Sequence, residues 1–199
     1  PSGSGKSTLL NCAAGLDSPT SGRIVVGDTD ISRLSADALT RFRRRHVGFV
    51  FQSYKLVPHL TVQENLHLPW WLDSTAPDLA RQEELLEAVG LAGMGHRRPT
   101  ELSGGQAQRV AIARALVNQP DVVFADEPTG ALDSHTGAKI LATLRAAVER
   151  FDQTLVMVTH DPVVAAAADE VVFLADGAVV DRAVSASAAE ISDRVLNLG

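Results

Sequence analysis

The stretch Leu102-Ser103-Gly104-Gly105-Gln106 decides the fold, because this glycine-rich turn lies between a second glycine-rich segment and an apolar run that ends in two carboxylates. Before it, the chain opens with Pro1-Ser2-Gly3-Ser4-Gly5-Lys6-Ser7-Thr8. After it, the apolar run 122–125 ends in the carboxylates Asp126 and Glu127. A glycine-rich turn that opens a helix presents backbone N–H groups to an anion. Two such turns, far apart in one chain, predict a site shared between two copies of the protein.

The opening segment has the pattern of a phosphate-binding loop, Gly-x-x-x-x-Gly-Lys-Ser/Thr. In that pattern the glycines let the backbone wrap the phosphates, the lysine meets the outer phosphates, and the hydroxyl residue ligates magnesium. A short Gly/Ser run is also typical of a linker. Here Lys6-Ser7-Thr8 leads directly into the mostly apolar run 9–14, which favours phosphate binding. The predicted nucleotide-binding residues of this segment are Ser2, Gly3, Ser4, Gly5, Lys6, Ser7 and Thr8.

The chain begins inside this motif. The first glycine of the pattern, and the strand that would deliver the chain into the loop, would both precede Pro1. The first residue is also Pro rather than Met. We therefore expect the chain to be truncated at its N-terminus.

Composition favours one intracellular α/β domain. A chain of 199 residues with 45% hydrophobic residues is long enough for one core. Its single cysteine, Cys12, forms no internal disulfide, which fits a reducing compartment. The net charge of −6 argues against broad nucleic-acid binding. No apolar run is long enough to cross a bilayer, so we expect any membrane role to come from a partner.

Strand-like runs alternate with helical runs, which predicts a mainly parallel sheet. We expect strands at 22–26, 47–51, 122–125, 155–158, 171–174 and 178–180. Between Gln52 and Gln119 the pattern becomes helical, most clearly at 79–89 and 106–117. The fold class is therefore α/β, in a single domain spanning 1–199. A helical lobe at about 53–119 is inserted into the sheet.

Asp126 and Glu127 carry the prediction of hydrolysis. An acidic residue at the end of a buried strand beside a phosphate-binding loop can hold magnesium. Side chains alternate along a strand, so we expect the next carboxylate to point elsewhere. Glu127 would then orient or deprotonate an attacking water. A lone Asp-Glu pair is more often a polar strand end, but here four apolar residues precede it and Pro128-Thr129-Gly130 follows.

Three further polar residues follow predicted strands or open a helix. Gln52 and His160 come after strands, so we expect them at the same sheet edge as Asp126. Asp133 precedes a helical run, where its plain role is to cap the helix. None of these residues alone indicates a function, because such positions are commonly surface or capping sites.

Taken together, the order Gln52, Ser103, Asp126, Glu127, Asp133 and His160 resembles the ATP-binding domain of ABC transporters over essentially the whole chain. The resemblance implies a P-loop NTPase fold that holds ATP and Mg²⁺. It implies Glu127 and His160 as catalytic residues, with His160 contacting the γ-phosphate and positioning the water. It implies a metal site formed by Ser7, Gln52 and Asp126.

The same resemblance implies a homodimer of ATPase domains that encloses two ATP molecules. In that arrangement Asp133 lies in a loop that contacts the opposite subunit. The ATP held by one subunit is contacted by the signature residues of the other, which are Ser103, Gly104, Gly105 and Gln106.

The stretch 50–58, together with 126–133, resembles the bacterial lipoprotein-release and macrolide-efflux branch. This implies an integral membrane permease as partner, no nucleic acid, and a place at the cytoplasmic face of the plasma membrane. An ATPase that regulates cell-wall hydrolysis through a membrane partner stays an alternative, and a ribosome-acting ATPase is a weaker one. The substrate is not encoded in these motifs.

Two features leave alternatives open. The basic run 41–46 would meet anionic lipid headgroups or an acidic partner, or form a solvated helix end. Trp70 and Trp71 lie in the predicted helical lobe, either in a groove for a permease helix or buried in the lobe itself.

Overall fold

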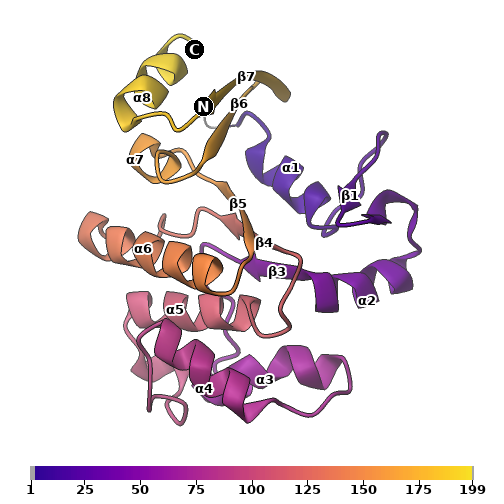
Figure 1. Cartoon of the computed structure of the whole chain (residues 1–199), viewed down its shortest axis with the longest axis vertical. Coiled ribbons are helices and arrows are strands. Elements are labelled where there is room, and N and C mark those ends of the chain that lie inside the picture. Colours follow the sequence, from indigo (N-terminus) through magenta and orange to yellow (C-terminus); the bar gives the residue numbers. More distant parts are fainter. Residues whose placement is uncertain (1–2, 199) are drawn as a thin grey trace.

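The computed structural model describes residues 3–198, and Figure 1 shows the whole arrangement. The α-helices are α1 (Lys6–Ala13), α2 (Ala36–His46), α3 (Val62–Leu72), α4 (Leu79–Ala88), α5 (Gly104–Ala115), α6 (Ser134–Arg150), α7 (Pro162–Ala165) and α8 (Ala188–Leu196). The strands are β1 (Val25–Val26), β2 (Thr29–Asp30), β3 (Val47–Val50), β4 (Val122–Asp126), β5 (Thr154–Val158), β6 (Glu170–Ala175) and β7 (Ala178–Val184). Short 3-10 turns occur at η1 (Ile31–Arg33) and η2 (Pro99–Glu101).

The central sheet is parallel, with the order β3-β4-β5. Val47 pairs with Val122, and Val122 pairs with Thr154. Residues 122–125 are all buried because β4 has a strand on each side and helices over both faces. The parallel sheet confirms the predicted α/β fold, and the carboxyl ends of its strands meet at one edge.

Hydrophobic clusters cover both faces of this sheet. On one face Val123 and Ala125 pack with residues of α3, α4, α5 and α6. On the other, Val122 and Phe124 pack with residues of α1, α2 and the β1 region. A third cluster lies between the β6–β7 hairpin and the helices α7 and α8. Figure 1 shows this hairpin above the sheet, next to α1.

The two C-terminal strands form an antiparallel hairpin beside the parallel sheet, which agrees with a sheet predicted to be only mainly parallel. The reason for the antiparallel pairing lies in the turn. Asp176 and Gly177 have φ values of 48° and 77°, so both central residues of this two-residue turn are left-handed. Such a turn joins antiparallel strands directly, because parallel strands need a long crossover. The Gly177 N–H donates to the Ser4 carbonyl at 3.2 Å and brings this turn to the glycine-rich loop.

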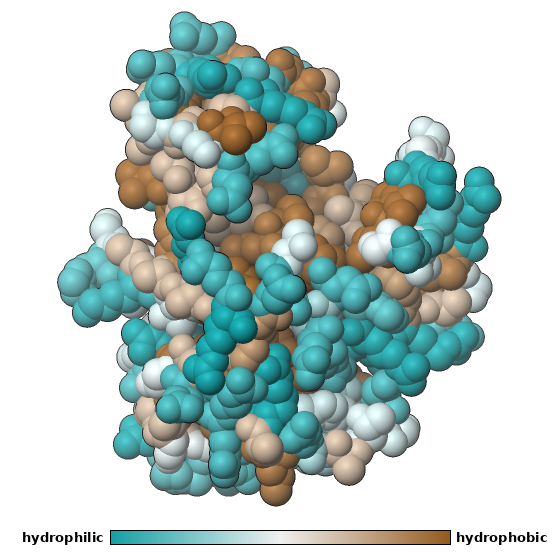
Figure 2. All heavy atoms as spheres, in the orientation of Figure 1, coloured by the Kyte–Doolittle hydropathy of each residue, from teal (hydrophilic) through white to brown (hydrophobic). Residues whose placement is uncertain are grey.

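β5 lies at the edge of the parallel sheet formed by the described residues. Its Val156 side chain is 41% exposed. Figure 2 shows hydrophobic surface in the middle of the molecule, in the region where Figure 1 places β5. Within residues 3–198, no helix is both long and apolar enough to cross a membrane.

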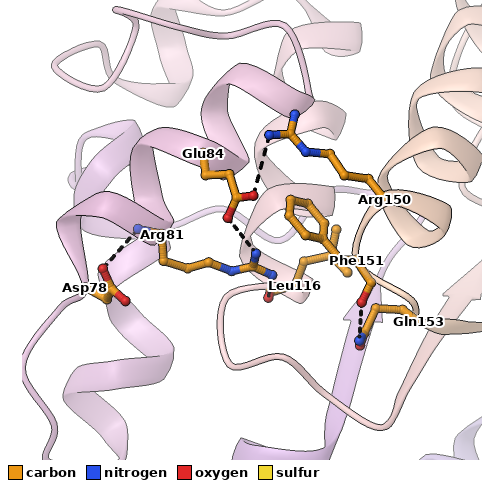
Figure 3. A network of polar contacts seen from close by, with 7 residues as sticks. All are labelled: Asp78, Arg81, Glu84, Leu116, Arg150, Phe151 and Gln153. Carbon is orange, nitrogen blue, oxygen red and sulfur yellow. Dashed lines mark hydrogen bonds and ion pairs between the residues drawn. The ribbon is translucent and has the colours of Figure 1, made fainter.

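A polar network holds α4 to the ends of two other helices, as Figure 3 shows. The Arg81 guanidinium pairs with Glu84 at 2.9 Å and donates to the Leu116 carbonyl at 3.2 Å. It also lies 4.0 Å from the centroid of the Phe151 ring. Leu116 caps the C-terminus of α5 and Phe151 caps that of α6. Arg81 therefore supplies a donor to a carbonyl that the end of α5 leaves open.

The basic run at the end of α2 makes contacts within the molecule. Arg43 donates to the Gly15 carbonyl at 2.6 Å, and Arg44 donates to the Leu72 carbonyl at 2.7 Å. Arg45 pairs with Asp73 at 2.8 Å. These contacts join α2 to the loop after α1 and to the end of α3, so three of its arginines hold helices in place.

Candidate functional site

The first turn of α1 is built to receive an anion. Gly5 caps this helix with a φ of 88° and, as a glycine, brings no side chain to bond to the first turn. Gly3 also has a positive φ, of 80°. Glycine adopts this left-handed backbone without the penalty of a Cβ, and the helix N-terminus favours negative charge. Ser2, which was also predicted to bind nucleotide, lies outside the described residues.

A cleft of about 520 Å³ lies between this loop and the carboxyl edge of the parallel sheet. It brings together residues more than a hundred positions apart in sequence. The cleft is lined by Gly3, Gly5, Lys6, Ser7, Thr8, Glu127, Val158 and His160. Inside the loop, the Lys6 Nζ donates to the Ser4 Oγ at 3.1 Å.

Ser7 and Asp126 meet beside this cleft. The Ser7 Oγ donates to the Asp126 Oδ1 at 3.0 Å. Magnesium is commonly held by one or two protein oxygens, with substrate phosphates and water supplying the rest. The donor pair fits that chemistry. Among residues 3–198 there is no group of three or more His, Cys, Asp or Glu side chains arranged to hold a metal by itself.

Glu127 and His160 form a close polar contact within the cleft. The His160 Nδ1 and the Glu127 Oε1 are 2.7 Å apart. Glu127 lies just after the end of β4, and its φ is 46°. Its N–H donates to the Val158 carbonyl at 3.0 Å. The direction of this carboxylate is therefore set by a left-handed turn held against β5, and not by the strand alternation that the sequence suggested.

Gln52 lies against the turn after Glu127. A Cβ placed on Gly130 would be 2.8 Å from the Gln52 Nε2, so a larger residue there would require the Gln52 amide to shift. The Gly130 N–H donates to the Glu127 carbonyl at 3.0 Å. Gln52 was predicted to contact the metal; here it packs beside the turn that follows Glu127 and is not among the residues that line the cleft.

The signature residues open α5 as a capping box. The Ser103 Oγ accepts from the Gln106 N–H at 3.3 Å, and the Gln106 Oε1 accepts from the Ser103 N–H at 2.9 Å. A Cβ on Gly105 would come within 2.8 Å of the Thr136 Cγ2, so this glycine permits close packing on α6. Neither Ser103, Gly104, Gly105 nor Gln106 lines the cleft of the same chain.

Asp133 caps α6, as its position predicted. Its carboxylate accepts from the backbone N–H groups of His135 at 3.1 Å and Thr136 at 3.0 Å. Hydrogen bonds from the side chain and backbone of Thr136 lower the pKa of Asp133 below its ordinary value. The carboxylate thus stays charged where it faces the positive end of the helix.

The sequence analysis did not predict two residues of α5, Gln108 and Arg114, whose side chains bond to the backbone of loops beside this site. Gln108 is completely buried, and its Nε2 donates to the Pro128 carbonyl at 2.8 Å. Arg114 donates to the carbonyls of Tyr54 at 2.9 Å and Lys55 at 2.7 Å, and burial lowers the pKa of this guanidinium. The helical spacing could have indicated that Gln108 is buried, because it lies four residues before the apolar Ile112 and therefore on the same face of the helix.

Comparison with known proteins places the chain in a family. The family model described as "ABC transporter" matches residues 1–130. The chain is 50% identical over 183 residues to the lipoprotein-releasing system ATP-binding protein LolD of Anaeromyxobacter dehalogenans, covering 90% of this chain and 77% of that protein. It is also 50% identical over 181 residues to the macrolide export ATP-binding/permease protein MacB of Shigella flexneri. That alignment covers 90% of this chain and spans 28% of the length of MacB.

A solved structure agrees with this assignment. A dimeric ATP-binding cassette, in a post-hydrolysis state bound to ADP and Pi, superimposes with a TM-score of 0.82 at 42% identity. The match covers 94% of this chain and 83% of that one. The glycine-rich loop, the parallel sheet and the order of motifs all agree with this likeness. The chain belongs to the ABC transporter family and has the fold of its ATP-binding cassette.

Proposed function

We propose that this chain is the ATP-hydrolysing motor of a bacterial ABC transporter of the macrolide-export or lipoprotein-release type. The observation that carries the proposal is the cleft in which the glycine-rich loop faces the Glu127–His160 pair. Such a cleft offers both an anion site and a base at one place. The MacB and LolD relatives support the choice of transporter branch.

Binding of Mg-ATP follows from the loop. The N-terminus of α1 and the Lys6 ammonium attract the phosphate groups. Ser7 and Asp126 would hold magnesium, which when bound neutralises charge on the phosphate oxygens. Their hydroxyl–carboxylate contact of 3.0 Å supports this role. Gln52 would reach the magnesium ion or the attacking water only if its side chain moved away from its present position beside Gly130.

Hydrolysis follows from the carboxylate at the end of β4. Glu127 accepts a proton from water as the water oxygen bonds to the γ-phosphorus. The bond between that phosphorus and the oxygen bridging to the β-phosphate breaks, so ADP and phosphate form. His160 holds the carboxylate through its 2.7 Å contact and, as a residue that lines the cleft, would contact the γ-phosphate. General base catalysis of this kind contributes on the order of a hundred- to ten-thousand-fold.

The complete site is proposed to need two copies of the chain. Ser103–Gln106 do not line the cleft of their own chain, and the related cassette was solved as a dimer. In the proposed homodimer the signature turn of one copy faces the ATP of the other. Asp133 lies in the loop that contacts the opposite copy.

A permease is proposed to bind the helices α3 and α4, within a helical lobe at about 53–119. Trp71 and Leu72 at the end of α3 are 46% and 56% exposed, and Leu79 at the start of α4 is 60% exposed. Trp70 is instead buried, where it packs near the His67 ring. These exposed apolar side chains offer a contact for a membrane partner at the cytoplasmic face of the plasma membrane.

The direct test is phosphate release by the purified full-length protein in the presence of Mg-ATP, with and without its permease. We expect turnover that disappears when EDTA removes the metal. The two relatives then guide the choice of transport assay, with either lipoprotein release or macrolide export measured in reconstituted vesicles. Absence of Mg-ATP turnover in both preparations would refute the proposed function.

A further inference from the structure

Gln108 connects three parts of the proposed site. Its side chain is completely buried in the middle of α5. The amide Nε2 donates to the Pro128 carbonyl at 2.8 Å and makes a longer contact of 3.4 Å with the Phe51 carbonyl. These partners lie 20 and 57 positions away in the chain. One amide thus joins α5 to the segments that follow β4 and β3.

The two carbonyls are next to functional side chains. Pro128 directly follows Glu127, and Phe51 directly precedes Gln52. The Glu127 backbone is already held on its other side, where its N–H donates to Val158 of β5. The turn that aims Glu127 is therefore fixed between β5 and α5.

Arg114 of the same helix holds the backbone on the other side of Gln52. It donates to the carbonyls of Tyr54 and Lys55, whose φ values of 57° and 49° are both left-handed. α5 therefore bonds to the backbone just before Gln52 and again just after it. Because such contacts depend on direction and distance, a displacement of α5 changes the position of the backbone around Gln52.

The chemistry of the amide suits this position. A glutamine amide carries two N–H groups without a charge, and can serve two carbonyls in a dry interior. Its Oε1 is buried and has no hydrogen-bond partner among the residues that the structure describes. An unpaired buried oxygen opposes folding, so a role in packing alone would be served better by an apolar side chain.

We propose that Gln108 is a positioning residue, which couples the position of the signature helix α5 to the geometry of Glu127 and Gln52. When a partner's ATP engages Ser103 at the start of α5, the helix carries the Gln108 amide with it. The Pro128 carbonyl and the Glu127 turn follow. This inference rests on the proposed function, in which Glu127 activates water.

The test substitutes Gln108→Met in the full-length protein, which keeps the length of the side chain and removes both donors. A displacement of the reacting groups by about 1 Å can cost on the order of a hundredfold in rate. We expect kcat to fall by about tenfold to a hundredfold, with KM for ATP changed by less than about twofold. Gln82→Met is the matched control, because Gln82 is also buried and bonds to His67 within the helices α3 and α4. It should lower the melting temperature and leave the kcat of the protein without its permease unchanged.

A double variant distinguishes an effect on the position of Glu127 from a general loss of stability. Once Glu127→Gln has removed the base, adding Gln108→Met should lower the residual turnover no further, because the loss of kcat in Gln108→Met is expected to arise through the Glu127 carboxylate. Independent, multiplying losses would overturn the inference. So would a normal kcat in Gln108→Met, or an equal loss of kcat in Gln82→Met.

The outcomes also distinguish this inference from the proposed function. If Glu127→Gln keeps normal turnover, the proposed function itself fails. If Glu127→Gln is inactive while Gln108→Met is normal, only the positioning role fails. Should Gln108→Met not fold, Gln108→Asn keeps the amide but shortens its reach, and the same loss of kcat at constant KM is expected.

Discussion

His160 Nδ1 lies 2.7 Å from Glu127 Oε1, joining the segments that follow β5 and β4 where both side chains line the cleft. The His160 side chain is 72% exposed, whereas Glu127 is only 17% exposed. The carboxylate is therefore held by a side chain that faces solvent. This arrangement leaves the histidine accessible to a bound phosphate while it fixes the direction of the carboxylate.

The first prediction concerns Glu127→Gln. The amide keeps the size of the side chain but lacks the basicity needed to take a proton from water. Turnover should fall on the order of a hundred- to ten-thousand-fold. Mg-ATP should still bind, because Lys6, Ser7 and Asp126 remain, and uncleaved ATP should make the dimer accumulate. Phosphate release and light scattering on the full-length protein measure both effects.

Glu149→Gln is the control for that change, since Glu149 is an exposed carboxylate on α6 that pairs with Arg145. It should leave turnover unchanged. Near-normal turnover in Glu127→Gln would reduce Glu127 to a polar strand end. Lost turnover without an ATP-dependent dimer, at intact ATP binding, would break the proposed link between hydrolysis and reopening.

The second prediction tests whether the site is shared between copies. Ser103→Arg should abolish hydrolysis and spare binding of ATP to the loop of the same chain. Lys6→Ala should weaken that binding itself, because the lysine meets the outer phosphates. In a mixture of the two inactive variants, each heterodimer contains one intact site, so turnover should partly return. Full activity of Ser103→Arg alone would rule out a shared site.

The third prediction concerns the Arg81 network. Arg81→Met removes an ion pair, a hydrogen bond to Leu116 and the stacking on Phe151. Loss of such buried contacts should lower the free energy of unfolding on the order of 2 kcal/mol. The free energy of unfolding of Arg81→Lys should lie between those of Arg81→Met and the unaltered protein, because an ammonium keeps the charge but lacks the planar guanidinium. Urea denaturation measures the change.

Arg23→Met gives the comparison for an exposed ion pair, because the Arg23 side chain is 67% exposed. Its effect on unfolding should be much smaller than that of Arg81→Met. Equal losses in the two variants would show that the network in Figure 3 adds nothing beyond an ordinary surface contact.

The fourth prediction concerns pH. Hydrogen bonds from Thr61, Thr136 and Ser187 lower the pKa values of Glu64, Asp133 and Glu190 below ordinary values of 4.5 for Glu and 3.8 for Asp. A carboxylate with a lower pKa in the folded state stabilises it fully above the ordinary value. That stability is lost as pH falls through the folded pKa.

The melting temperature should therefore stay level down to about pH 5 and fall below it. Glu190→Gln should flatten part of this fall, because the amide does not titrate. A melting temperature that declines equally in Glu190→Gln and in the unaltered protein would show that this carboxylate contributes nothing to acid unfolding.

The sequence by itself determined the features that depend on local backbone chemistry. Gly5 at a left-handed helix cap, the capping Asp133 and the apolar strand before Asp126 each follow from what a short segment requires. Their order along the chain was enough to predict the α/β fold and the family. The helices expected at 79–89 and 106–117 appear as Leu79–Ala88 and Gly104–Ala115, since the caps at Asp78 and Ser103 decide where they begin. Of the run 22–26, only Val25–Val26 pairs as a strand.

Only the tertiary structure decided which side chains meet. The direction of Glu127 depends on a hydrogen bond to Val158, and the arginines of α2 find partners in the loop after α1 and at the end of α3. Gln108 reaches a carbonyl 57 positions away, and Arg81 reaches one 35 positions away. No local sequence pattern predicts contacts between such distant segments, because these contacts form only when packing of the hydrophobic core brings the segments together.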